Sequence, residues 1–139
     1  MGSEMCIRDR VIIGLHVEDT IYGELYFEYS SKRRAYGEAI ERRLIETAPE
    51  VILCHLKVSP QVIRERMIAN AHPYGVLKDA DIDKVLSRFE KDFSSSTLPR
   101  KITLDTGTST IDETMIEFGE KIEPYLTDRD LIRRSSHFR

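Results

Sequence analysis

Two short runs, VILCHL at residues 51–56 and KITLDT at 101–106, most constrain the fold of this chain. Both are rich in β-branched and other apolar residues, which favours β-strands. A third run, VIIG at 11–14, has the same character, and the stretches between the runs have helical spacing of apolar residues. Strands that are apolar on both faces and alternate with helices predict an α/β protein. We therefore expect a three-layer parallel sheet with helices on both faces.

The helices are marked by apolar spacing and by capping residues. From Asp81 onward, apolar side chains recur at helical intervals. Residues 32–47 also read as a helix, with its predicted apolar side formed by Tyr36, Ala39, Ile40 and Leu44. Thr110 and Glu113 have the spacing of a capping box, which opens the last helix. We expect that helix to bury five apolar side chains: Ile111, Met115, Phe118, Ile122 and Leu126.

Arg66 lies on the apolar side of its predicted helix. Ser59 and Pro60 form an N-cap and first-turn pair that opens this helix. At about 100° per residue, Arg66 falls among the apolar positions, whereas Arg64 points almost the opposite way. A guanidinium group is costly to dehydrate alone. Arg66 must therefore reach solvent, pair with an acid such as Asp105, or face a cleft that receives an anion.

The composition limits the classes of partner. The chain has 139 residues, enough for one domain with a core, and its net charge of -3 gives no reason to expect nucleic acid. No apolar run approaches the roughly 20 residues needed to span a membrane. Cys6 and Cys54 are far apart and form no metal-binding or redox spacing. We expect a cytoplasmic domain with no metal ligands and no nucleic-acid or membrane partner.

The two ends of the chain differ from the part between them. Residues 1–10 include the string SEMCIRDR, which resembles a translated sequencing adapter, so we expect natural sequence to begin near Val11. The alternative is a short disordered terminus. We expect the domain to cover residues 11–126 and a basic tail to cover 127–139. The tail could contact a polynucleotide, but two aspartates interrupt it, which favours a solvated tail.

Three segments together carry a family resemblance: VILCHLKVSPQVIRERM, DIDKVLSRFEKDF and KITLDTGTSTIDETMIEF. Over residues 48–126 their order resembles the C-terminal half of P-loop kinases in the nucleoside-monophosphate-kinase-like group. The resemblance implies an ATP-dependent kinase of a small molecule, such as a nucleoside or nucleotide, with ATP and Mg²⁺ as cofactors. It also implies a truncated P-loop NTPase fold.

The resemblance assigns catalytic roles to two arginines. Arg66 matches the arginine that starts a mobile lid, residues 67–87 match the lid, and Arg88 matches the arginine on the helix after it. A phosphoryl group in transfer spreads negative charge over its oxygens, and planar guanidinium donors stabilise that charge. The alternative for Arg66 is a structural ion pair.

The loop after the last strand carries the predicted nucleotide-binding residues. Asp105, Thr106, Gly107 and Thr108 match the family loop whose backbone groups hold the base. The alternative is a simple strand-to-helix turn, in which the Asp105 and Thr108 side chains satisfy backbone donors.

The first part of the domain carries the predicted residues for the phosphoryl acceptor. His16 and Glu18 follow the first apolar run and could bind an acceptor hydroxyl or serve as a base, or they are ordinary surface groups. Tyr22 and Tyr26 share a helical face, which either stacks against an acceptor ring or packs in the core.

The chain departs from the family pattern in two features. No glycine of this chain is followed by lysine, so no phosphate-binding loop GxxxxGK[ST] is present. Ile13 stands where many relatives have an acid. We therefore expect a fragment that lacks the first strand and the P-loop, and that alone binds ATP poorly and transfers phosphate negligibly. The alternative hypothesis is a non-catalytic kinase-like scaffold that binds a protein partner.

Overall fold

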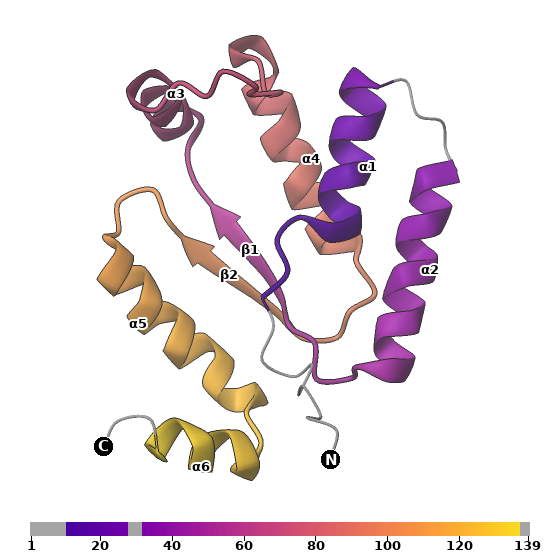
Figure 1. The fold of residues 1–139 in the computed structure, drawn as a ribbon, viewed down its shortest axis with the longest axis vertical. Coiled ribbons are helices and arrows are strands. Elements are labelled where there is room, and N and C mark those ends of the chain that lie inside the picture. The colour runs from indigo at the N-terminus through magenta and orange to yellow at the C-terminus, as the bar shows by residue number, and fades with distance from the viewer. Residues whose placement is uncertain (1–10, 28–31, 137–139) are drawn as a thin grey trace. The chain divides into compact units, whose positions relative to one another are not determined.

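A computed structural model describes residues 11–27 and 32–136 (Figure 1). The adapter-like segment at 1–10 and the end of the predicted tail at 137–139 lie outside the described residues. The adapter assignment therefore stays a prediction.

The chain forms two compact units. The helical unit comprises Met1–Val51 and Asp83–Thr97, and the sheet unit comprises Ile52–Ile82 and Leu98–Arg139. In its described part, the helical unit contains α1 (Leu15–Tyr26), α2 (Lys32–Thr47) and all but the first residue of α4 (Ile82–Ser95). The sheet unit contains β1 (Leu53–Lys57), α3 (Pro60–Ala69), the short 3₁₀ helix η2 (Asp79–Asp81), β2 (Lys101–Asp105), α5 (Ile111–Ile122), the 3₁₀ helix η3 (Glu123–Tyr125) and α6 (Asp128–Ser136).

The prediction of a three-layer parallel sheet is wrong. The described part of the chain is mostly helical, and its sheet has two strands, β1 and β2. The run at 11–14 forms no strand, and its three apolar side chains are between 64% and 89% exposed. A strand exists only where a neighbour pairs with it, and apolar composition alone does not supply that neighbour. Gly14 and Leu15, with φ of 77° and 46°, then turn the chain into α1.

The two strands that do form are the ones predicted at 51–56 and 101–106. They are parallel neighbours, which confirms that part of the prediction (Figure 1). The register pairs Leu53 with Lys101, Cys54 with Ile102, His55 with Thr103, Leu56 with Leu104, and Lys57 with Asp105. Ile102 and Leu104 are buried, and α5 packs against β2. Part of the apolar core of the sheet unit therefore lies along β2.

Capping side chains fix the starts of two helices in the sheet unit. At α3, the Ser59 Oγ accepts a hydrogen bond from the Val62 N–H at 3.4 Å, and Pro60 occupies the first turn. At α5, the Thr110 and Glu113 side chains accept hydrogen bonds from each other's backbone N–H groups. Both predicted helix starts are confirmed. They could be predicted because each capping side chain and its backbone partner lie close together in the sequence.

The burial predicted for α5 is wrong in its first half. Ile111 and Met115 are 83% and 59% exposed, whereas Phe118, Ile122 and Leu126 are half-buried. A sheet of two strands offers too little surface to cover the whole apolar stripe of the helix. The segment predicted as a basic tail contains α6.

The helical unit is held together by contacts between its helices. Ile21 of α1 and Val85 of α4 are buried, and α1 packs against α2. Gly37 of α2 allows close approach, because a Cβ there would lie 3.3 Å from the Cδ2 of His16. Among the described helices, none has both the length and the apolar character required to cross a bilayer.

Candidate functional site

Arg66 reaches the loop that follows β2. Its Nη2 donates a hydrogen bond to the carbonyl oxygen of Thr106 at 2.5 Å, and the contact is exposed to solvent. The acid considered as its partner, Asp105, instead accepts a hydrogen bond at Oδ1 from the Gly107 N–H at 2.8 Å. Arg66 therefore reaches solvent, and a backbone carbonyl rather than a carboxylate fixes its position.

The two arginines of α3 differ in charge balance. Arg64 pairs with Asp79, with 3.2 Å between Nε and Oδ1. Arg66 makes no ion pair with a carboxylate among residues 11–27 and 32–136. Its guanidinium thus keeps uncompensated positive charge beside the end of β2, where an anion can approach from solvent.

The loop after β2 is tied to the end of β1. The N–H and Oγ1 of Thr106 both donate hydrogen bonds to the Lys57 carbonyl oxygen, at 2.8 and 3.1 Å. The structure thus brings Asp105, Thr106 and Gly107 together with Arg66, while Thr108 is exposed. The N–H groups of Thr106 and Gly107 have acceptors within the protein. These two N–H groups are therefore not free to donate to a nucleotide base, as the prediction for this loop required.

Arg88 lies on α4, in the helical unit, and two carboxylates balance its charge. Its Nη2 donates to the Glu24 Oε2 at 2.5 Å, and its Nε donates to the Asp92 Oδ1 at 3.4 Å. Burial acts to lower the pKa of Arg88, but the hydrogen bonds and charges of Glu24 and Asp92 outweigh it and raise the pKa. The two arginines predicted to act on one phosphoryl group therefore belong to different units. Arg88 would have to leave both acids to bind an anion.

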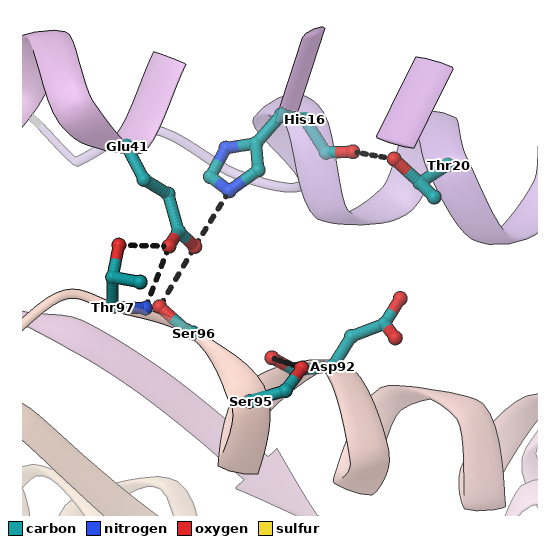
Figure 2. A network of polar contacts seen from close by, with 7 residues as sticks. All are labelled: His16, Thr20, Glu41, Asp92, Ser95, Ser96 and Thr97. Carbon is teal, nitrogen blue, oxygen red and sulfur yellow. Dashed lines mark hydrogen bonds and ion pairs between the residues drawn. The ribbon is translucent and has the colours of Figure 1, made fainter. Parts of the chain in front are cut away.

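Glu41 is the centre of a polar network in the helical unit (Figure 2). Its Oε1 accepts hydrogen bonds from the His16 Nε2 at 3.0 Å and the Ser96 Oγ at 2.7 Å. Its Oε2 accepts from the N–H and the Oγ1 of Thr97, both at 2.8 Å. A single side chain of α2 thus joins α1 to the residues that follow α4.

The Glu41 carboxylate is stabilised in its charged form although the residue is only 7% exposed. Burial acts to raise the pKa of Glu41, but the hydrogen bonds from Ser96, Thr97 and His16 outweigh it and hold the pKa below its ordinary value. A buried carboxylate that accepts four hydrogen bonds is satisfied where it lies. The network therefore holds the helical unit together.

The order of groups in this network does not suit nucleophilic catalysis. In a catalytic triad, the histidine lies between the carboxylate and the hydroxyl group that it activates. Here the Glu41 carboxylate lies between His16 and Ser96 (Figure 2). His16 is nearly buried, and its Nδ1 has no hydrogen-bond partner within the described residues. In this arrangement it does not face solvent as a base for an acceptor.

The other residues predicted to bind the acceptor also lie on α1. Glu18 is exposed in the first turn, and the described residues before the helix, 11–14, form no strand. Tyr22 stacks on Tyr26 and meets Phe89 edge to face, with ring centroids 6.1 Å apart in both pairs. Burial, with smaller effects of Glu18 and Tyr26, raises the pKa of Tyr22. These contacts correspond to the core-packing alternative for the two tyrosines.

Sequence reasoning missed Glu41 because it placed the buried side of α2 elsewhere. The predicted side included Tyr36 and Ile40, which are exposed, whereas Gly37 and Glu41 are buried. The sequence signal that could have identified the buried side of α2 is Gly37, which lies one helical turn before Glu41. A small residue lets a second helix approach, and an acid there then needs partners from that helix.

Comparisons with known proteins found no relative of this chain. No protein-family model, no curated protein and no solved structure matches it. The resemblance to P-loop kinases therefore rests on the sequence segments alone.

Proposed function

We propose that this chain binds the phosphate groups of a nucleotide beside Arg66, as part of an ATP-dependent kinase of a small molecule. One observation carries the proposal. Arg66 holds an exposed guanidinium at the end of β2, fixed to the Thr106 carbonyl oxygen and neutralised by no carboxylate of the described residues. The remaining N–H donors of such a group match pairs of phosphate oxygens.

The roles of the other groups in this proposal follow from their surroundings. Within the described residues, no three His, Cys, Asp or Glu side chains are grouped to hold a metal ion. Magnesium would therefore arrive with ATP and neutralise part of the triphosphate charge. Arg66 would bind and orient phosphate oxygens, while the acceptor, a nucleoside or nucleotide, would bind elsewhere. Such an enzyme would act in the cytoplasm, where ATP is available.

The test is a calorimetric titration of ATP with magnesium into three proteins: wild type, Arg66→Ala and Arg42→Ala. Arg42 is a matched control, since it is an exposed arginine on α2 whose side chain makes no hydrogen bond or ion pair to any described residue. We expect Arg66→Ala to weaken binding about tenfold or more, the effect of losing charge-assisted hydrogen bonds. Arg42→Ala should bind like wild type. Because the chain has no P-loop, we expect wild type to bind weakly but measurably. Equal affinities in all three proteins, or no measurable binding by wild type, would overturn the proposal.

A non-catalytic scaffold that binds a protein partner is the second candidate. It is favoured by apolar side chains exposed on α5 and α6: Ile111, Met115, Ile116, Leu131 and Ile132. Exposed apolar patches mark interaction surfaces. This candidate predicts a cooperative melt whose midpoint ATP with magnesium does not change. An increase in the midpoint that Arg66→Ala abolishes would contradict it.

A further inference from the structure

We infer that Asp105 positions Arg66 through the peptide group that joins Thr106 to Gly107. The inference rests on the proposed function, because it concerns the arginine assigned to the phosphate groups. Asp105 would then act by orienting Arg66 and not by contacting the nucleotide base. The loop after β2 would be part of the anion site.

The peptide group between Thr106 and Gly107 is held at both of its polar atoms. Its N–H, from Gly107, donates to the Asp105 Oδ1 at 2.8 Å, and its carbonyl oxygen, from Thr106, accepts from the Arg66 Nη2 at 2.5 Å. In a trans peptide the N–H and the C=O point in opposite directions. The Asp105 side chain, by fixing the direction of the N–H, therefore fixes where the carbonyl oxygen meets Arg66.

Two further contacts limit how this peptide group can turn. The N–H and Oγ1 of Thr106 both donate to the Lys57 carbonyl oxygen, which ties the preceding peptide to the end of β1. A Cβ at Gly107 would lie 3.1 Å from the Asp105 Oδ1, so the close approach of the carboxylate suits glycine. Arg66 thus receives its orientation from a loop that is braced against the strand ends.

The inference makes a prediction opposite to that of simple electrostatics. Asp105 carries a negative charge near the site proposed for an anion, so its removal should strengthen phosphate binding by Coulomb's law. If Asp105 also positions Arg66, removing its acceptor oxygen should weaken binding. Asp105→Asn separates the two effects, because the amide keeps an acceptor oxygen but loses the charge.

We would titrate ATP with magnesium into wild type, Asp105→Ala and Asp105→Asn at pH 7. We expect Asp105→Asn to bind as tightly as wild type or more tightly, and Asp105→Ala to bind about fivefold more weakly than Asp105→Asn, the effect of one hydrogen bond. Equal binding by the two variants, or tighter binding by Asp105→Ala, would overturn the inference. If Asp105→Ala fails to fold, Asp105→Leu takes its place in the comparison, because leucine has a similar size but no acceptor oxygen.

A measurement without ligand separates this inference from the proposed function. The side-chain nitrogen signals of Arg66, assigned by their loss in Arg66→Ala, should show faster rotation of the guanidinium in Asp105→Ala than in Asp105→Asn. If that difference is present but Arg66→Ala binds ATP normally, the proposed function fails while the coupling stands. If Arg66→Ala loses ATP but the two Asp105 variants show the same Arg66 signals, the coupling fails and the proposed function stands.

Discussion

Glu41 is a buried, charged residue of the helical unit. Its hydrogen-bond partners determine how much stability the unit loses when the Glu41 carboxylate is removed. Glu41→Ala would leave the donors of His16, Ser96 and Thr97 without an acceptor in a largely buried position. We expect this to lower the free energy of unfolding by about 3 kcal/mol. Glu38→Ala is the control, because Glu38 is exposed on the same helix. Urea unfolding followed by circular dichroism measures both, and equal stability of the two variants would contradict the role given to the network.

The same carboxylate makes stability depend on pH. The folded pKa of Glu41 lies below its ordinary value of 4.5, so the unfolded chain takes up a proton at higher pH than the folded chain does. The stabilisation is therefore present above about pH 4.5 and is lost as the pH falls through the folded pKa. Unfolding free energies measured down to pH 3 should fall less steeply for Glu41→Gln than for wild type. Parallel curves would show that Glu41 is not the group responsible.

The helices α3 and α5 show which elements local chemistry specifies. Their starts were predicted because each cap joins residues only three positions apart, as in the pairs Ser59–Val62 and Thr110–Glu113. The strand predicted at 11–14 was wrong because strand pairing joins distant segments. The prediction of burial along α5 was partly wrong for the same reason. Helical spacing shows that apolar residues share a face, but it does not show whether another element covers that face.

The capping box of α5 should stabilise the first turn of that helix. Thr110→Ala removes the acceptor for the Glu113 N–H, an orphan donor of the first helical turn. We expect a loss of about 1 kcal/mol in unfolding free energy and faster amide exchange confined to the first turn of α5. Ser109→Ala, one residue before the cap, should show neither effect. Unchanged exchange in Thr110→Ala would mean that packing on β2, rather than the cap, holds this turn.

In the whole molecule, the side chains of the candidate site find their partners far along the chain. Arg66 bonds to a residue 40 positions away, and Glu41 bonds to residues 25 and 56 positions away. The sequence could predict that Arg66 is unusual, since it falls among apolar positions of its helix. It could not predict that a backbone carbonyl would receive it, because every residue carries that acceptor and only the fold selects one.

The division into two units predicts that substitutions in the two cores act locally. The chain passes from one unit to the other between residues 51 and 52, 82 and 83, and 97 and 98, so α4 begins in one unit and continues in the other. Ile21→Ala removes buried apolar surface from the helical unit, and Ile102→Ala does so in the sheet unit. Each should cost about 2–4 kcal/mol, whereas Ile68→Ala, at an exposed position of α3, should cost little.

Hydrogen exchange measured on peptides shows which elements each substitution destabilises. If each unit has its own core, Ile21→Ala accelerates exchange in α1, α2 and α4 before it affects the strands, and Ile102→Ala does the reverse. A single cooperative core would instead give the same acceleration in both units for either substitution. The three chain crossings tie the units covalently, while Ile21 and Ile102 lie in different units. We therefore expect the two patterns to differ, with α4 as the element that responds to both substitutions.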